Sequence, residues 1–271
     1  MPFAQSAGAR IHYSDTDPDR RDGPVVVLLQ GLGLSSRFWF DVPESLAPRR
    51  VLAVDNRGTG KSHRPRGVWT MGAMADDVAA VLDDAGAPDA IIAGISMGGM
   101  IAQHVALRHP TRVRGLVLFA TTPGFLYGAM PETAAMLRLL SIPFGGKRAS
   151  QNLGRLLLPE SKWDRAREIF REWPSAMRDE SPSSATFVAH LFAASTHMSG
   201  PRLGGIRCPT VVVTGDSDAL VPRRNAEVLA RRIPGAELEV VADTGHAVFA
   251  EDRDLVRRMV MRVEDRYSPG S

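Results

Sequence analysis

Cysteine and lysine are scarce in this sequence of 271 residues. With a single cysteine, Cys208, the chain cannot form an intrachain disulfide. The only lysines are Lys61, Lys147 and Lys162, so arginine supplies almost all of the positive charge, in short groups among acidic and apolar residues. The formal net charge is +3. These features indicate a mixed, solvated surface, and we expect no nucleic-acid partner.

Long hydrophobic runs are also missing. No stretch approaches the roughly 18 apolar residues of a membrane-spanning helix, and residues 1–10 lack the apolar segment of a signal peptide. With 44% hydrophobic and 23% charged residues, the composition is that of an ordinary globular protein. We therefore expect a soluble, cytoplasmic protein with no membrane partner, either a monomer or a homodimer.

Short apolar runs alternate with helical patterns over much of the chain. Residues 71–85 and 101–107 have the apolar spacing of helices. The runs fit strands that are buried on both faces of a parallel sheet, and they lie at residues 25–29, 51–54, 90–93, 116–119, 211–213 and 238–241. This alternation predicts an α/β fold with a mostly parallel, doubly wound sheet. Residues 11–13 form a candidate edge strand that precedes it.

The alternation stops between residues 124 and 205. This stretch has no clear strand, but it has several short apolar patterns separated by prolines. We interpret it as a helical cap inserted into a core formed by residues 1–123 and 206–271. Its apolar residues indicate a small-molecule substrate with an apolar part; they include Leu153, Leu156, Leu157, Phe187, Phe192 and Met198.

The strongest chemical signal is the sequence Gly-Ile-Ser-Met-Gly-Gly at residues 94–99. It follows a predicted strand and precedes a predicted helix, which is the context of a G-x-S-x-G nucleophile elbow. Glycines two residues before and after Ser96 remove the Cβ atoms that would clash in such a sharp turn. We therefore predict that Ser96 is a nucleophile at the carboxyl end of the sheet.

A serine hydroxyl needs a base to accept its proton. His246 is the best candidate, because it lies in a loop after the last predicted strand and precedes a helical pattern at residues 247–260. Packing or surface positions explain the remaining histidines better; these are His12, His63, His104, His109, His190 and His197.

The histidine in turn needs a carboxylate to fix its tautomer. Asp218, in the loop after the strand at residues 211–213, is the preferred partner. Asp216, two residues closer to that strand, is its competitor. The loop after the strand at residues 116–119 offers no acid, since it reads Thr121-Thr122.

The order serine, acid, histidine and the three loops that carry them resemble the α/β-hydrolase superfamily. Residues 55–62, Asp-Asn-Arg-Gly-Thr-Gly-Lys-Ser, resemble its D-x-R-G-x-G-x-S loop, and residues 30–33 resemble its H-G-x-G oxyanion loop. The layout is similar to that of capped esterases, enol-lactonases and cofactor-free perhydrolases. The resemblance implies an oxyanion hole made by the backbone amides of Leu32 and Met97. Gln30 stands where the family usually has histidine, and we expect it to support the loop through hydrogen bonds.

Two nucleotide-binding patterns are excluded. Residues 58–62 end like a Walker A loop, but Asp55 stands at the first glycine position and Pro65 follows almost at once, where a helix is needed. Gly31 and Gly33 resemble the start of a dinucleotide fingerprint, whose third glycine is Ser36 here. No H-E-x-x-H or C-x-x-C pattern indicates a metal site. We expect neither a cofactor nor a metal.

These residues together predict a serine hydrolase that cleaves a carboxylic ester or lactone through an acyl-enzyme on Ser96, with Asp218 ionised throughout. Other triad chemistry stays open, because one fold supports many reactions: perhydrolysis, C–C bond hydrolysis or acyl transfer. A ligand-binding protein that hardly turns over is a further alternative. A serine at the elbow argues against the dehalogenases and epoxide hydrolases, which use aspartate there.

Overall fold

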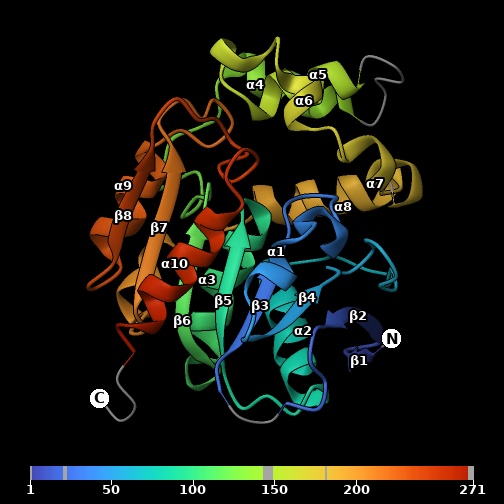
Figure 1. The fold of residues 1–271 in the computed structure, drawn as a ribbon, viewed down its shortest axis with the longest axis vertical. Helices are drawn as coiled ribbons and strands as arrows, with labels where there is room; N and C mark the ends of the chain where they lie inside the picture. The colour runs from blue at the N-terminus through green and yellow to red at the C-terminus, as the bar shows by residue number, and fades with distance from the viewer. Residues whose placement is uncertain (1, 21–22, 143–148, 181, 268–271) are drawn as a thin grey trace.

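The computed structural model describes residues 2–20, 23–142, 149–180 and 182–267. Within these residues one eight-stranded sheet runs through the molecule, in the order β1-β2-β4-β3-β5-β6-β7-β8 (Figure 1). Its strands are β1 (Phe3–Ser6), β2 (Ala9–Asp15), β3 (Val25–Leu29), β4 (Arg50–Val54), β5 (Ala90–Ile95), β6 (Val113–Phe119), β7 (Thr210–Gly215) and β8 (Glu237–Val241).

Strands β3 to β8 pair in parallel, and β2 joins β4 antiparallel. Every residue of β3, β4, β5 and β7 is buried, which explains why these strands read as continuous apolar runs. Val27 and Leu29 face one core and Val26 and Leu28 face the other, so the sheet is covered on both sides. The predicted α/β fold with a mostly parallel, doubly wound sheet is confirmed.

The N-terminal edge of the sheet differs from the prediction. Residues 11–13 belong to β2, which is an inner strand, and the edge strand is β1. The two form a hairpin through Ala7 and Gly8, which both have positive φ, as a two-residue hairpin turn with the twist of the sheet requires. Four residues with mixed burial left β1 without a recognisable pattern in the sequence.

Helices cover both faces of the sheet (Figure 1). Apolar residues of α2 (Met71–Asp84), α3 (Met97–Arg108) and α9 (Arg224–Arg232) pack into one core. Those of α1 (Val42–Ser45) and α10 (Asp254–Glu264) pack into the other. The helix predicted from residue 247 begins at Asp254. Val248 and Phe249 are apolar because their loop packs into the core, where the Phe249 ring stacks on Trp39 with centroids 5.0 Å apart.

Five α-helices of the described chain lie between β6 and β7 in sequence and above the carboxyl ends of the strands (Figure 1). They are α4 (Thr133–Ser141), α5 (Ala149–Leu157), α6 (Ala166–Ile169), α7 (Trp173–Glu180) and α8 (Ser184–Ser195). We call residues 124–205 the cap. Residues 143–148, within this range, lie outside the described residues. Four 3-10 helices complete the described elements: η1 (Ser36–Trp39), η2 (Pro110–Arg112), η5 (Glu160–Lys162) and η6 (Gly200–Gly205).

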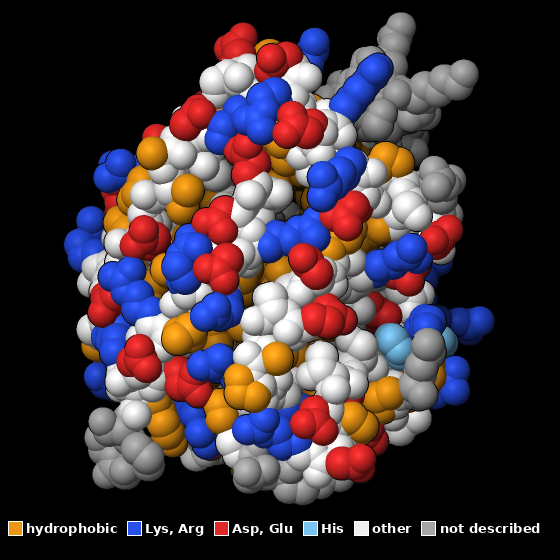
Figure 2. Space-filling view, viewed as in Figure 1, with side chains coloured by type: hydrophobic (Ala, Val, Ile, Leu, Met, Phe, Trp, Pro, Cys, Tyr) orange, Lys and Arg blue, Asp and Glu red, His pale blue; other side chains and the backbone are white. Residues whose placement is uncertain are grey.

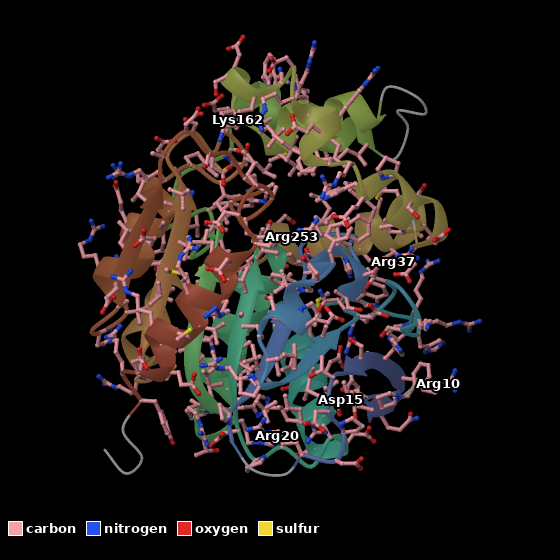
Figure 3. The ribbon with its side chains drawn as sticks, in the orientation of Figure 1. Arg10, Asp15, Arg20, Arg37, Lys162 and Arg253 are labelled. Carbon is pink, nitrogen blue, oxygen red and sulfur yellow. The ribbon has the colours of Figure 1, made fainter. Side chains whose placement is uncertain are left out.

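Charged and aromatic side chains join the cap to the core. Arg253, at the start of α10, forms ion pairs with Asp41 of the core and Glu172 of the cap, and its guanidinium lies 4.6 Å from the centre of the Phe40 ring. Figure 3 shows Arg253 at the junction between the two parts. Nearby, the rings of Phe38 and Trp173 meet edge to face at 5.1 Å. The cap is therefore held against the core beside the strand ends.

The surface carries both signs of charge. In Figure 2, Lys and Arg side chains alternate with Asp and Glu side chains across the face shown, as the short arginine groups of the sequence suggest. In the part of the chain that the structure describes, no helix has the length and apolarity needed to cross a membrane.

Two histidines lie close to each other, His197 buried and His104 half-buried. His197, in the cap, donates from Nε2 to the carbonyl of Thr122 (3.0 Å), and its ring lies 5.2 Å from that of His104 on α3. Burial is the main cause that lowers the pKa of His104 to about 4 and that of His197 to about 3. The positive charge of Arg202 lowers both further. Both rings are therefore neutral in the folded protein at mildly acidic pH.

We predict a loss of stability on acidification from this pair. An unfolded histidine binds a proton near pH 6.5, whereas the folded rings stay neutral down to about 4 and about 3. Between these values the unfolded state holds more protons, so the free energy of unfolding falls as pH falls, by ~1.4 kcal/mol per pH unit for each histidine. Urea unfolding at pH 7, 6 and 5 measures this slope.

The matched variants are His104→Leu and His63→Leu. The first should lower the pH dependence of the unfolding free energy by about the equivalent of one bound proton. His63 is an exposed loop residue, so its removal should leave the contribution of His104 and His197 intact. Equal slopes for wild type and His104→Leu would contradict this origin of the acid sensitivity.

Candidate active site

Ser96 occupies a strained turn between β5 and α3. Its φ is 54° and its ψ −116°, in a region that costs a residue with a side chain ~1–3 kcal/mol. The neighbouring glycines make the turn possible. A Cβ on Gly94 would lie 2.3 Å from the carbonyl oxygen of Gly98, and a Cβ on Gly98 would lie 2.1 Å from that of Leu29. The G-x-S-x-G spacing is therefore a steric requirement of this turn.

Hydrogen bonds from β6 and the loop that follows it hold the turn in place. The Ser96 amide donates to the carbonyl of Phe119 (2.9 Å), and the hydroxyl of Thr121 donates to the carbonyl of Ser96 (2.7 Å). Thr121 also packs where a side chain on Gly99 would be, since a Cβ there would lie 2.7 Å from its own. Sequence reasoning missed this support, because it examined residue 121 only as a possible acid.

The structure brings His246 and Asp218 together. Nδ1 of His246 lies 2.8 Å from one carboxylate oxygen of Asp218, and both residues are buried. The other carboxylate oxygen accepts the amides of Leu220 (2.9 Å) and Val221 (2.8 Å). A carboxylate only accepts hydrogen bonds, so this contact selects the neutral tautomer with the proton on Nδ1 and the lone pair on Nε2. The pair therefore has the form of a histidine base with an orienting acid.

Asp216, the competing acid, has a different position. Its carboxylate accepts the amides of Asp243 (3.1 Å) and Thr244 (3.2 Å) at an exposed site, and thus joins the loops that follow β7 and β8. The cap contributes to the same region, since the amide of Ala247 donates to the carbonyl of Leu157 at the end of α5 (3.0 Å). These contacts fix the backbone on both sides of His246.

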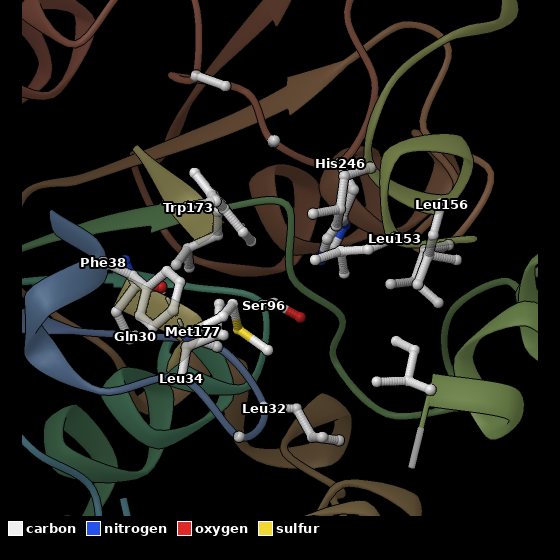
Figure 4. A pocket seen from close by; sticks show the side chains of 18 of the residues that line it. Gln30, Leu32, Leu34, Phe38, Ser96, Leu153, Leu156, Trp173, Met177 and His246 are labelled. Carbon is white, nitrogen blue, oxygen red and sulfur yellow. Dashed lines mark hydrogen bonds between the residues drawn. The ribbon is translucent and has the colours of Figure 1, made fainter. Parts of the chain in front are cut away.

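Ser96 and His246 line one cavity beneath the cap (Figure 4). Within the described chain, no hydrogen bond joins the Ser96 hydroxyl to His246. In sites of this kind the contact between nucleophile and base often tightens only when substrate is bound. The half-buried serine and the histidine line the same cavity, and Nε2 of His246 has no hydrogen-bond partner in the described part of the chain.

The loop after β3 forms a turn against Ser96. The amide of Leu34 donates to the carbonyl of Gly31 (3.2 Å), and Gly33 has φ of 75°, as a type II turn requires at its third position. A Cβ on Gly31 would lie 3.5 Å from that of Ser96. Among the described residues, the amides of Leu32 and Met97 donate no hydrogen bond to the protein, so both are available to a ligand at the serine.

Gln30 supports this turn. Its side-chain oxygen accepts the amide of Gly31 (3.1 Å), and its carbonyl accepts the side-chain amide of Asn56 (3.0 Å). Gln30 is buried and lines the cavity. A glutamine can therefore bind the loop at the position where the family usually has histidine.

Residues 55–62 brace the loops around the site. The carboxylate of Asp55 accepts the amide of Ser36 (2.8 Å), the amide of Lys61 (3.0 Å) and Nδ1 of His12 (2.8 Å). Burial acts to raise the pKa of Asp55, but these hydrogen bonds outweigh it and lower that pKa. Within the described residues, no group of three or more His, Cys, Asp and Glu is placed to hold a metal ion.

Two apolar pockets meet at Ser96. The histidine-side pocket, about 120 Å³, contains His246. The methionine-side pocket, about 440 Å³, contains Met97 and Met100. Both are lined by Leu32, Ser96, Leu139 and Leu220. Of the cap residues expected near substrate, Leu153, Leu156, Leu157 and Phe187 line the first pocket, Phe192 lines the second, and Met198 lines neither.

Known proteins share this sequence and fold. A family model described as alpha/beta hydrolase fold matches residues 24–253. A protein of Azorhizobium caulinodans, provisionally named carbamate hydrolase RutD, is 32% identical over 96% of this chain and 97% of its own. The pimeloyl-acyl-carrier-protein methyl ester esterase of Nitrosomonas europaea is 30% identical over 89% of this chain and 94% of its own.

A solved structure of a thermophilic esterase from Thermogutta terrifontis has a TM-score of 0.79 and 25% identity, over 98% of this chain and 99% of that one. These relatives are hydrolases by name, and each is similar along nearly the whole chain. Since the family model also spans most of the sequence, this protein is a member of the α/β-hydrolase family.

Proposed function

We propose that this protein is a serine hydrolase that cleaves esters or lactones of small, apolar substrates through an acyl-enzyme on Ser96. One observation supports the proposal: Ser96, in its strained turn, and His246, paired with Asp218, line one cavity with apolar walls, and the amides of Leu32 and Met97 beside the serine donate no hydrogen bond within the described residues. Each group matches one requirement of acyl transfer, namely a nucleophile, a base with its orienting acid, and donors for an oxyanion.

In the proposed reaction Oγ of Ser96 attacks the substrate carbonyl carbon while Nε2 of His246 takes the hydroxyl proton. The carbonyl oxygen becomes an oxyanion, which the amides of Leu32 and Met97 stabilise. The bond to the leaving oxygen then breaks, and His246 returns the proton to that oxygen. A water molecule, deprotonated by His246, then attacks the acyl carbon; the bond from that carbon to Oγ of Ser96 breaks, His246 returns the proton to Oγ, and the acid is released. Asp218 stays ionised and stabilises the imidazolium that forms twice in the cycle.

The two pockets suggest how the alcohol and acyl parts of an ester would be placed. His246 must reach the leaving oxygen to protonate it, so the leaving alcohol belongs in the histidine-side pocket. The acyl chain then extends into the methionine-side pocket, next to the Met97 amide that would bind the oxyanion. Because the second pocket is the larger, we expect broader tolerance for the acyl chain than for the alcohol.

Carbamate hydrolysis is a second candidate, favoured by the 32% identity to the protein provisionally named a carbamate hydrolase. The same serine could attack a carbamate carbonyl. However, a small carbamate is strongly polar. Among the described residues that line the histidine-side pocket, the one fully charged side chain is Arg253, which is already paired with Asp41 and Glu172. The apolar lining thus favours esters. Turnover of p-nitrophenyl acetate against p-nitrophenyl carbamate, which differ in one group of similar size, separates the two.

The triad assignment predicts the effect of three substitutions. Ser96→Ala should abolish labelling by a fluorophosphonate probe and lower kcat for p-nitrophenyl esters by on the order of 10⁴-fold or more. Asp218→Asn should lower kcat by about 10⁴-fold, because the amide would favour the wrong histidine tautomer. Asp216→Asn is the matched control. It lies two residues away and accepts two backbone amides and the hydroxyl of Ser217 at an exposed site, so most activity should remain.

Absence of labelling in folded wild-type protein would contradict the proposed mechanism, and so would equal losses in the two aspartate variants. Stoichiometric labelling of the wild type without multiple turnover would instead favour a ligand-binding protein.

The pocket assignment predicts opposite specificity changes for two cap variants. Met136 on α4 lines only the methionine-side pocket, and Met177 on α7 lines only the histidine-side pocket. Both are half-buried methionines, so their replacement by tryptophan is a matched pair. Met136→Trp should lower kcat/KM for ethyl hexanoate about 10-fold or more relative to ethyl acetate, because bulk in a filled pocket costs ~1–3 kcal/mol. Met177→Trp should lower kcat/KM for hexyl acetate by about the same factor relative to ethyl acetate.

Measured kcat/KM values for the three esters give the comparison directly. If Met136→Trp discriminated by alcohol length and Met177→Trp by acyl length, the pocket assignment would be reversed.

A further inference from the structure

His190 connects the cap to the loop that carries Leu32. It lies on α8 and is fully buried. Its Nδ1 accepts the amide of Gly33 (3.1 Å), and its Nε2 donates to the carbonyl of Arg57 (3.0 Å). The residues it joins are 157 and 133 positions away in the sequence. A single side chain of the cap thus bridges two loops of the core at the edge of the candidate active site.

The two hydrogen bonds require one form of the ring. Nδ1 must have a free lone pair to accept the Gly33 amide, and Nε2 must carry the proton that it donates to a carbonyl. A protonated ring could not accept at Nδ1. Burial, the main cause, lowers the pKa of His190 to about 4, so the neutral ring persists at neutral and mildly acidic pH.

The Arg57 end of this bridge is held in place by a buried ion pair. The guanidinium of Arg57 binds both carboxylate oxygens of Asp77 on α2 at 2.7 Å, and the two side chains are buried. One turn before His190 on the same helix, the hydroxyl of Thr186 donates to the carbonyl of Gly58 (3.2 Å). Helix α8 is therefore docked on residues 57 and 58, and His190 extends from this docked position to Gly33.

The Gly33 end lies next to the expected oxyanion donor. The Gly33 amide belongs to the peptide between Leu32 and Gly33, which is the central peptide of the 31–34 turn. Type I and type II turns differ by a flip of this peptide, which changes the ψ of the residue before it and the φ of the residue after it. A hydrogen bond to the Gly33 amide selects the orientation seen here, and so holds ψ of Leu32 and with it the form of the 31–34 turn.

We propose that His190 is a positioning residue for the oxyanion hole: by holding the Leu32–Gly33 peptide, it maintains the 31–34 turn that presents the Leu32 amide, which belongs to the preceding peptide, beside Ser96. This inference rests on the proposed hydrolase function. It makes the cap a contributor to transition-state binding, in addition to being a wall of the pockets.

Two substitutions separate the halves of the bridge. In His190→Asn the side-chain oxygen lies near the position of Nδ1 and can still accept the Gly33 amide. In His190→Gln the side-chain nitrogen lies near the position of Nε2 and can still donate to Arg57, but the acceptor for Gly33 is lost. We expect His190→Gln to lower kcat for an ester by ~10- to 100-fold, the usual cost of a misplaced group. His190→Asn should retain substantially more activity.

KM should change by less than about 3-fold in both, because an oxyanion donor acts mainly in the transition state. Thr186→Val, which removes the other polar contact of α8 with residues 57 and 58, controls for loosening of the cap. It should lower stability while kcat per active site stays near wild type. Active sites are counted by fluorophosphonate labelling, so unfolded protein does not enter kcat.

Equal losses of kcat in His190→Asn and His190→Gln would overturn the proposal, and so would an effect on KM alone. In either case, turnover by the wild type would still support the hydrolase function. A wild type that neither labels nor turns over would instead refute the proposed function itself. If neither variant folds, 15N NMR of wild-type histidines gives the answer: phosphonylation of Ser96 should shift Nδ1 of His190, and an unchanged resonance would count against the coupling.

Discussion

The close approach of α3 to the ends of β3 and β5 is the constraint on which the site depends. Gly98 lies so near Leu29 that no side chain fits between them, and Gly94 is equally close to Gly98. This contact forces the chain through the strained conformation of Ser96 and places the Met97 amide at the start of a helix, where negative charge is favoured. The turn at residues 31–34 and the His246 loop are then arranged around a serine whose position is set by backbone sterics.

The sequence predicted the parts of the molecule whose signals are local. Continuous apolar strands, the glycine spacing around Ser96 and the loops of Asp218 and His246 can each be recognised within a few residues. The edge hairpin and the start of α10 were predicted wrongly, because β1 is short and the apolar loop before α10 packs into the core.

His190 shows why the remainder of the site could not be predicted. Its two partners lie more than 130 residues away, so no local pattern distinguishes it from a histidine on the polar face of a cap helix. The two pockets could not be predicted from local patterns either, since their walls come from α3, from the loop after β3 and from several cap helices at once. Contacts between distant segments decide these features, and they require the assembled fold.

The apolar lining of the two pockets also bears on how the proposed reaction would end. An ester enters uncharged, but hydrolysis leaves an ionised acid, and an unpaired charge is costly to keep in apolar surroundings. In the described part of the chain, the lining of the methionine-side pocket offers that carboxylate no charged partner, and the arginine of the other pocket is already paired with two carboxylates. The change of charge would therefore weaken binding of the acid and favour its release, which leaves the site open to the next uncharged ester.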